Sequence, residues 1–196
     1  MKVYLIRHGQ TNGNAEKWHQ GWGDACLTEK GINQAEGARE VLKDIKFDRI
    51  ICSDLLRTKQ TCNIIFGEDA PVEYEPRVRE INNSVFMGQS RDDLYEKYGD
   101  DYIKNCHYMD FSSYGGESAD EIVQRSKDFL HSLRQDTKSK NIAVVTHGGT
   151  IKAIISAILG CKLYGPNFHI NNCSVTVLKF KNGVWSILHI SNQSEI

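Results

Sequence analysis

The sequence lacks the long apolar segments that membrane proteins carry. No stretch approaches the roughly twenty consecutive apolar residues of a spanning helix, and the N-terminus shows no basic region followed by a long apolar segment. Proline is scarce, at 3 residues of 196, and no stretch rich in proline, glycine or serine divides the chain. We therefore expect a single domain over residues 1–196, located in the cytoplasm and without a membrane partner.

An excess of either charge is also missing. The 24 lysines and arginines nearly balance the 25 aspartates and glutamates, which gives a formal net charge of −1. A chain without a basic excess has no global attraction to nucleic acid or anionic lipid, so we expect no nucleic-acid partner. The sequence leaves the oligomeric state open.

Cysteine pairs of the Cys-x-x-Cys type, which commonly bind zinc, are absent. The six cysteines are instead spread through segments that we expect to form core elements, which favours reduced thiols over disulfides. They are Cys26, Cys52, Cys62, Cys106, Cys161 and Cys173.

What the sequence does contain is an alternation of strand and helix patterns. Apolar periodicity predicts strands near residues 2–7, 48–53, 72–75, 142–146, 173–180 and 184–190. Helical patterns lie near residues 29–43, 54–66, 117–135 and 149–159. This alternation predicts a three-layer α/β/α sandwich with a mainly parallel central sheet. The turn Lys181-Asn182-Gly183 predicts that the last two strands form an antiparallel pair.

The helix near residues 29–43 has a clear start and a clear buried face. Thr28 is a plausible N-cap, because a threonine hydroxyl can accept a hydrogen bond from a free N–H of the first turn. The residues expected along one face are Ile32, Ala35, Ala38 and Leu42.

Three predicted strands end in side chains that suit phosphate chemistry. Arg7-His8-Gly9 follows the first strand, Arg57 the second, and Thr146-His147-Gly148-Gly149 ends the strand near 142–146. The carboxyl ends of parallel strands share one edge of a sheet, where helix N-termini and loop amides favour anions. Arginine can bind phosphate oxygens in bidentate fashion, and neutral imidazole is a nitrogen nucleophile. The sequence therefore predicts a site that holds and attacks a phosphate.

Residues 82–116 carry no clear strand–helix pattern, and we expect a small cap insertion that covers the site and determines substrate specificity. Its aromatic and methionine side chains have two interpretations, a satellite core or a wall for the ligand. They are Phe86, Tyr95, Tyr98, Tyr102, Tyr108, Met109, Phe111 and Tyr114.

Several motifs follow one another along the chain: Leu5-Ile6-Arg7-His8-Gly9-Gln10-Thr11 with Asn14, Gln20-Gly21-Trp22-Gly23-Asp24, Leu27-Thr28-Glu29-Lys30-Gly31, Ser53-Asp54-Leu55-Leu56-Arg57-Thr58, Arg79-Glu80-Ile81, Gly115-Gly116-Glu117-Ser118 and Thr146-His147-Gly148-Gly149. With these motifs in this order, the chain resembles the histidine phosphatase superfamily, the phosphoglycerate mutase-like proteins. The resemblance covers nearly the whole length and is closest to the family's broad-specificity phosphatases.

The resemblance implies a role for each of five catalytic residues. His8 would attack phosphorus and become phosphorylated. Arg7, Arg57 and His147 would bind the equatorial oxygens, on which negative charge must be stabilised. Glu80 would protonate the leaving oxygen and would then act as the base that activates water.

The resemblance also implies phosphate-binding roles for Asn14, Gly21 and Gly148, and it implies neither a metal nor another cofactor. Asn14 would add a neutral side-chain donor, and Gly21 a backbone amide. The remaining histidines are expected to be surface or packing residues; they are His19, His107, His131, His169 and His189.

The match to the family is imperfect after the acid. Family members commonly read Glu-Ile-x-x-Gly-x-Trp-Glu-Gly, whereas this chain reads Glu80-Ile81-Asn82-Asn83-Ser84-Val85-Phe86-Met87-Gly88. Ser84 stands in place of a glycine, and Met87 in place of a carboxylate. We therefore expect an atypical turn and an atypical polarity on the substrate side of the pocket.

The pattern favours a phosphatase over a mutase. A cofactor-dependent phosphoglycerate mutase would carry an arginine directly after the acid, where this chain has Ile81, and an additional basic insert. We predict a metal-independent phosphatase that hydrolyses a small phosphorylated metabolite through a phosphohistidine. Three alternatives stay open: an α-ribazole-5′-phosphate phosphatase, a cofactor-dependent phosphoglycerate mutase and a noncatalytic phosphate-binding module.

Overall fold

The computed structural model of the protein describes residues 1–190, except for the side chain of Asn167. Its strands are β1 (Lys2–Arg7), β2 (Arg49–Cys52), β3 (Val72–Tyr74), β4 (Asn141–Thr146), β5 (Val175–Lys181) and β6 (Val184–Ile190). Its α-helices are α1 (Asn12–Ala15), α2 (Glu29–Leu42), α3 (Leu56–Phe66), α4 (Arg91–Tyr108), α5 (Ala119–Arg134) and α6 (Gly148–Leu159). Short 3₁₀ helices are η1 (Pro76–Val78), η2 (Ser84–Phe86), η3 (Ser112–Tyr114) and η4 (Gly165–Asn167).

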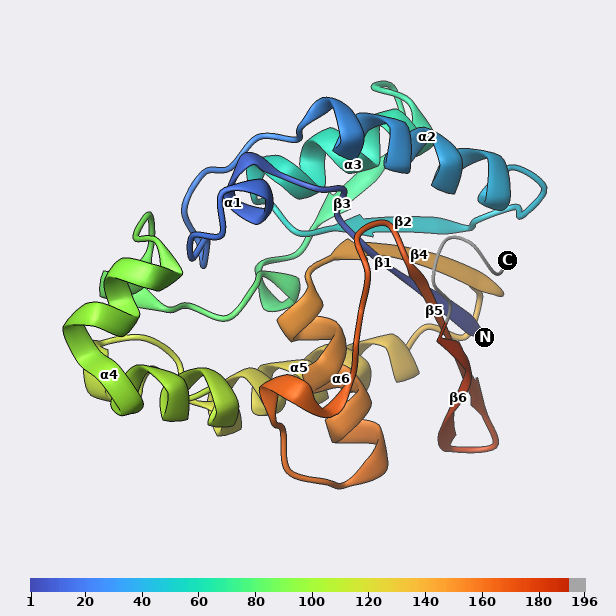
Figure 1. Ribbon diagram of the computed structural model, residues 1–196. Coiled ribbons are helices and arrows are strands. Elements are labelled where there is room, and N and C mark those ends of the chain that lie inside the picture. The colour runs from blue at the N-terminus through green and yellow to red at the C-terminus, as the bar shows by residue number, and fades with distance from the viewer. Residues whose placement is uncertain (191–196) are drawn as a thin grey trace.

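The strands form one mixed sheet in the order β3-β2-β4-β1-β5-β6. The pairs β3–β2, β2–β4 and β4–β1 are parallel, whereas β5 runs antiparallel to both β1 and β6. Helices α2 and α3 cover one face of the sheet, and α5 and α6 cover the other (Figure 1). The predicted three-layer α/β/α fold with an antiparallel last strand pair is confirmed.

Each central strand contributes side chains to both hydrophobic cores, because successive side chains of a strand point to opposite faces of the sheet. Leu5 packs in the core under α5 and α6, whereas Ile6 packs in the core under α2 and α3. In β4, Val144 packs in the core under α5 and α6, and Val145 packs in the core under α2 and α3. All four side chains are fully buried, which explains why these strands read as continuous apolar runs.

Helix α2 begins where the sequence predicts, but its buried face differs by one residue. The hydroxyl of Thr28 accepts a hydrogen bond from Gly31 N at 3.1 Å, so Thr28 is the N-cap. Ile32, however, is 42% exposed, and the prediction that it is buried is wrong. Gly31 takes the buried place, because a Cβ on Gly31 would lie 2.0 Å from the carbonyl oxygen of Gln10.

Residues 82–116 form a cap beside the end of the sheet (Figure 1). The cap contains η2, η3 and α4, and α4 is kinked where Gly99 takes φ 53° and ψ −131°. Phe86, Tyr102 and Phe111 are buried together in a third hydrophobic cluster. Phe86 therefore belongs to a satellite core, whereas Tyr102 and Phe111 belong to that core and also line a cavity, so both interpretations apply to them.

The helices and the cysteines bear on two expectations drawn from the composition. No helix within residues 1–190 has both the length and the apolar composition needed to cross a membrane. All six cysteines are free thiols.

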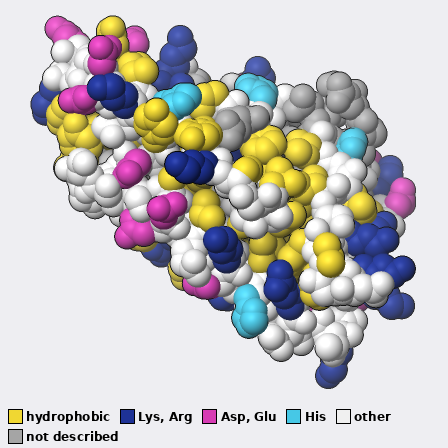
Figure 2. All heavy atoms as spheres, turned by 90° about the horizontal axis from the view of Figure 1, so that it is seen from below, with side chains coloured by type: hydrophobic (Ala, Val, Ile, Leu, Met, Phe, Trp, Pro, Cys, Tyr) yellow, Lys and Arg dark blue, Asp and Glu magenta, His cyan; other side chains and the backbone are white. Residues whose placement is uncertain are grey.

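Seen from below, hydrophobic side chains gather on one face between lysines and arginines (Figure 2). Exposed hydrophobic residues include Tyr108 at the end of α4 and Leu159 at the end of α6.

Candidate active site

The ends of two neighbouring strands, β1 and β4, bring the predicted histidines together. In the register of β1 and β4, Arg7 pairs with Thr146, so the next residues, His8 and His147, lie at the same level. The backbone fixes this arrangement, since His8 N donates to Thr146 O at 3.0 Å. The two imidazole rings lie edge to face, with centroids 5.2 Å apart.

His8 is held in the tautomer that a nucleophile needs. Its Nδ1 lies 2.7 Å from the carbonyl oxygen of Gly9, and a carbonyl can only accept, so Nδ1 carries the proton. The lone pair is therefore on Nε2. Burial lowers the pKa of His8 well below 6.5, and the neighbouring Arg57 and Arg7 lower it further. At neutral pH the ring is uncharged and nucleophilic.

His147 is fixed by Ser53, a residue that the sequence analysis did not single out. Ser53 Oγ accepts from Leu55 N at 3.5 Å and lies 2.8 Å from His147 Nε2. If the hydroxyl proton of Ser53 points to Nε2, the imidazole proton is on Nδ1. Burial lowers the pKa of His147 well below 6.5, and Arg57 and His8 add to the shift.

The two arginines use part of their guanidinium groups to hold the protein together. Arg57, which is 1% exposed, donates from Nη2 to Gly21 O at 2.8 Å and from Nη1 to Gly23 O at 3.1 Å. Arg7 donates from Nη1 to Ile170 O at 2.6 Å. Burial lowers the pKa of Arg57 to about 10, so it stays charged at neutral pH.

Three buried nitrogens of these side chains have no hydrogen-bond partner within residues 1–190. They are Arg7 Nε, Arg57 Nε and His147 Nδ1. A buried donor without a partner costs roughly 1–3 kcal/mol, and more when it is charged. Such a set is stabilised by an anion with several acceptor oxygens, and a phosphoryl group fits that description.

Asn14 is arranged as a donor with the help of a second asparagine. Its Oδ1 accepts from Thr11 N at 3.2 Å and from Asn172 Nδ2 at 3.3 Å, so its amide group has the NH₂ end available for a ligand. Asn172 also donates to His8 O at 3.0 Å. The sequence offered a signal for Asn172, because it lies three residues before the start of β5, whose first residues lie at the same sheet edge as the end of β1.

Glu80 faces the same cavity from outside the sheet. Its Oε1 accepts from Ile81 N at 2.9 Å, and its Oε2 accepts from Gly149 N at 3.1 Å in the first turn of α6. Its backbone oxygen accepts from Trp22 Nε1 at 2.7 Å. The acid is therefore fixed against the helix end that also carries Gly148.

The nearby arginines do not pair with Glu80. Arg77 forms an ion pair with Glu75 at 2.5 Å, and Arg79 forms one with Asp54 at 2.5 Å. Glu75 and Asp54 do not line the cavity. The two arginines therefore stabilise the outer wall, and neither forms an ion pair with Glu80.

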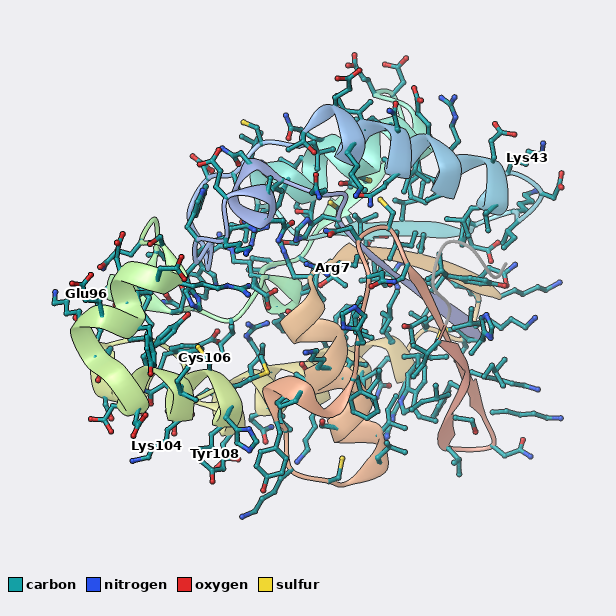
Figure 3. All side chains as sticks on the ribbon, viewed as in Figure 1. Arg7, Lys43, Glu96, Lys104, Cys106 and Tyr108 are labelled. Carbon is teal, nitrogen blue, oxygen red and sulfur yellow. The ribbon has the colours of Figure 1, made fainter. Side chains whose placement is uncertain are left out.

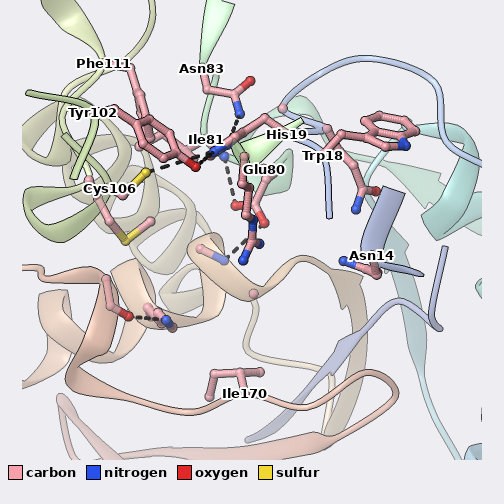
Figure 4. A pocket seen from close by; sticks show the side chains of 18 of the residues that line it. Asn14, Trp18, His19, Glu80, Ile81, Asn83, Tyr102, Cys106, Phe111 and Ile170 are labelled. Carbon is pink, nitrogen blue, oxygen red and sulfur yellow. Dashed lines mark hydrogen bonds between the residues drawn. The ribbon is translucent and has the colours of Figure 1, made fainter. Parts of the chain in front are cut away.

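One cavity of about 890 Å³ collects nearly all of the predicted site residues (Figure 4). Its lining includes Arg7, His8, Asn14, Gly21, Arg57, Glu80 and Gly148. His147 is fully buried behind His8. In Figure 4, Glu80 lies between Asn14 on one side and Tyr102 and Phe111 on the other.

Gly21 also contributes in a way that the sequence did not indicate. It has φ +46°, a conformation that glycine adopts without strain, and its carbonyl holds Arg57. Its backbone amide over the phosphate remains a prediction.

Four basic residues of the cavity wall were missed or assigned elsewhere by the sequence analysis. They are His19, Arg91, Lys152 and His169. His19 was expected on the surface or in packing, and its ring does pack against Tyr102. It also has polar partners: its Nε2 lies 2.8 Å from Tyr102 Oη, and its Nδ1 accepts from Asn83 Nδ2 at 2.9 Å. Burial lowers the pKa of His19 to about 4, and Arg91 contributes to the shift.

The residues that depart from the family pattern have identifiable places. Ser84 takes φ 43°, in the left-handed region that favours the usual glycine. Phe86 is fully buried in the cap, and Met87 lies against Gly21. A cluster of three or more His, Cys, Asp or Glu side chains that could bind a metal does not occur among the described residues.

Comparison with known proteins places this arrangement in a family. The histidine phosphatase superfamily (branch 1) matches residues 3–193 of the chain. A probable phosphoglycerate mutase of Erwinia tasmaniensis is 31% identical over 193 residues, which cover 94% of this chain and 87% of that protein.

Solved structures share the fold along nearly the whole chain. A phosphoserine phosphatase mutant from Entamoeba histolytica, in complex with phosphoserine, has a TM-score of 0.82 at 27% identity and covers 98% of this chain and 97% of its own. The α-ribazole phosphatase from Shigella flexneri has a TM-score of 0.86 at 24% identity, with the same coverage of 98% and 97%.

Proposed function

This chain belongs to the histidine phosphatase superfamily and is an enzyme of the phosphatase type, and we propose that it hydrolyses a small-molecule phosphate monoester through a phosphohistidine on His8. The observation that carries the proposal is the pairing of a neutral, oriented His8 with three unpartnered buried donors, on Arg7, Arg57 and His147. The nucleophile and the groups that would bind the transferred phosphoryl oxygens face one cavity or its floor.

In the first proposed step, His8 Nε2 forms a bond to phosphorus and the bond from phosphorus to the ester oxygen breaks. Arg7, Arg57 and the Nδ1–H of His147 donate to the oxygens on which negative charge is spread. Asn14 and the positive end of α6 at Gly148 add further attraction for the anion. Glu80 gives its proton to the ester oxygen, which leaves as an alcohol.

In the second step, water attacks phosphorus, the phosphorus–nitrogen bond breaks, and Glu80 takes the proton of the water. Inorganic phosphate leaves, and His8 returns to its neutral form. The proposal needs no metal, because two arginines supply the positive charge that a cation would otherwise contribute.

We assign residues 82–116 to substrate recognition within one domain. This segment supplies the cavity wall opposite the strand ends, through residues such as Tyr95, Tyr102 and Phe111. The ester group of the substrate would therefore contact the cap while the phosphoryl group contacts the sheet edge.

The experiment compares phosphate release from p-nitrophenyl phosphate and from alkyl phosphates, in EDTA, by native protein, His8→Ala and Glu80→Gln. We expect His8→Ala to lose activity on both esters. Glu80→Gln should lose more on alkyl phosphates, because p-nitrophenolate is a good leaving group that needs little protonation. Native protein that releases no phosphate from any ester, or an active His8→Ala protein, would refute the proposal.

A phosphoglycerate mutase is the second candidate, since the relative from Erwinia tasmaniensis carries that name. Isomerisation of phosphoglycerate in the presence of 2,3-bisphosphoglycerate, if faster than phosphate release, would favour it. α-Ribazole phosphate belongs in the same substrate panel, because the Shigella flexneri structure is named as its phosphatase.

A further inference from the structure

The cavity extends well beyond the groups that would hold a phosphate. At about 890 Å³ it is near the upper end of the roughly 300–1,000 Å³ that is typical of sites for drug-sized ligands. The phosphoryl group would occupy the end beside His8 and Arg57. The remaining volume is larger than the carbon skeleton of a three-carbon acid requires, so the alcohol part of the ester can be extensive.

One wall of this outer volume is apolar and partly exposed. Tyr95 and Ile103 of α4 line the cavity and are 53% and 50% exposed, and Met109 and Phe111 line it behind them. Large apolar side chains that stay accessible at the wall of a cavity are suited to contact an apolar part of a ligand.

Two cationic side chains lie in the same outer volume. Arg91 is the first residue of α4, and its guanidinium forms neither a hydrogen bond nor an ion pair with any described residue. Lys152 of α6 donates one of its three N–H groups to Gly165 O, which leaves two donors for a ligand. Neither cation forms an ion pair with a residue of the described part of the chain, 1–190.

The fields of both cations reach the phosphate end of the cavity. Burial lowers the pKa of Arg7 and of Lys152, and Glu80 opposes both shifts; Arg91 adds to the lowering for Arg7, and Arg7 adds to it for Lys152. These positive charges repel one another in the absence of ligand. An anion between them relieves the repulsion.

A charge balance indicates how many negative groups the outer volume accepts. A phosphate dianion balances Arg7 and Arg57, and the protonated Glu80 of the proposed first step is neutral. Arg91 and Lys152 then face one carboxylate in the cavity lining, that of Asp92, which leaves one positive charge unbalanced.

Resting on the proposed function, we infer that the preferred substrate is a phosphate monoester whose alcohol part joins an apolar body to one anionic group. The apolar body contacts Tyr95 and Ile103. The anionic group binds Arg91 and Lys152, which are specificity-determining residues.

The test uses two esters that differ only in charge. 4-(Carboxymethyl)phenyl phosphate is anionic at its far end, and 4-(carbamoylmethyl)phenyl phosphate is its neutral counterpart with the same ring and a methylene that separates the group from the leaving oxygen. We expect native protein to favour the carboxylate in kcat/KM by about tenfold, the size of one charge-assisted hydrogen bond in a partly exposed site.

The expected preference falls toward one in Arg91→Gln and in Lys152→Gln. Lys104→Gln is the matched control, because Lys104 is on α4 but points away from the cavity and lies 3.6 Å from Asp101 (Figure 3). A native ratio of one, or a ratio that both cavity variants retain, would overturn the inference.

A binding measurement separates this inference from the proposed chemistry. Calorimetry with His8→Ala protein gives the dissociation constants of both esters without turnover. A preference for the carboxylate that disappears in the Arg91→Gln/His8→Ala double variant supports the anion site, even if native protein hydrolyses neither ester. Equal dissociation constants for the two esters overturn it, even if both are hydrolysed.

Discussion

The sheet edge and the cap of residues 82–116 are opposite walls of one cavity, but they hold their side chains by different means. At the sheet edge the backbone does the positioning: His8 N is bonded to Thr146 O, and the His8 ring is bonded to Gly9 O. In the cap, side chains position one another: Phe86 packs against Tyr102 and Phe111 with ring centroids 5.9 and 5.7 Å away.

This difference separates two kinds of specificity. Backbone hydrogen bonds and strand register depend little on which side chains surround them, so the phosphate end has one geometry. Packed side chains can be exchanged for others of similar volume, so the cap can change its ligand wall while the sheet edge stays the same. We infer that reaction type resides in the sheet edge, and that substrate choice resides in the cap together with Lys152 of α6.

The largest effect that tests this division is expected from Arg57→Lys. Lysine keeps the charge, but it lacks the planar guanidinium that bonds Gly21 O and Gly23 O and still presents a third nitrogen. We expect kcat/KM to fall about 10²–10³-fold for every ester, as for the loss of one donor to a transition-state oxygen.

The matched cap variant is Tyr95→Ala, which alters only the outer wall. Its effect should differ from ester to ester, whereas that of Arg57→Lys should be uniform. Steady-state kinetics on p-nitrophenyl phosphate and on the two esters of different charge give both patterns. A uniform loss in Tyr95→Ala would contradict the division.

The same difference explains what the sequence could predict. Arg7, His8 and His147 stand at strand ends, and Arg57 lies in the first turn of α3, the helix that follows β2. A chain with recognisable strands fixes such positions along one edge. Thr28 was also recognisable as a helix cap from local sequence. These features depend on near neighbours in the chain or on the register of parallel strands.

The residues of the outer cavity wall could not be predicted in this way, because their places depend on contacts between distant segments. His19 lies in the cavity wall only because Asn83 and Tyr102 bind its two ring nitrogens. Arg91 and Lys152 come from different helices, and each is an ordinary surface residue by its local pattern. The prediction that Ile32 is buried was wrong for a related reason. Gly31, which approaches Gln10 closely, takes the buried place on α2.

An intermediate effect is expected from pH, and it concerns histidines in both regions. His8 has its pKa well below 6.5 through burial, and His19 has a pKa of about 4 through burial and Arg91. Between the folded pKa and about 6.5 the unfolded chain binds more protons than the native protein. The free energy of unfolding should therefore decrease as pH falls below 6.5, by at most about 1.4 kcal/mol per pH unit for each such histidine.

Urea unfolding at pH 6.5, 6.0, 5.5 and 5.0 measures this slope. His8→Asn and His19→Gln should each flatten it, the first over the whole range because the His8 site is fully enclosed and the second somewhat less because His19 is partly accessible. If native protein is equally stable at all four pH values, the buried-neutral description of these histidines is wrong.

The smallest expected effect concerns the turn that joins the acid to the cap. Ser84 takes φ 43°, and a non-glycine residue in this region costs of order 1 kcal/mol relative to glycine, part of which glycine loses again through its greater freedom in the unfolded chain. Ser84→Gly should therefore raise the free energy of unfolding by about 0.5 kcal/mol. Ser84→Ala is the control, because it keeps the strained φ and removes only the hydroxyl, so it should give no gain. If both variants gain equally, the hydroxyl and not the backbone is the cause; if only Ser84→Gly gains, the positive φ of residue 84 is strained, in the turn that joins Glu80 to the rest of the cap.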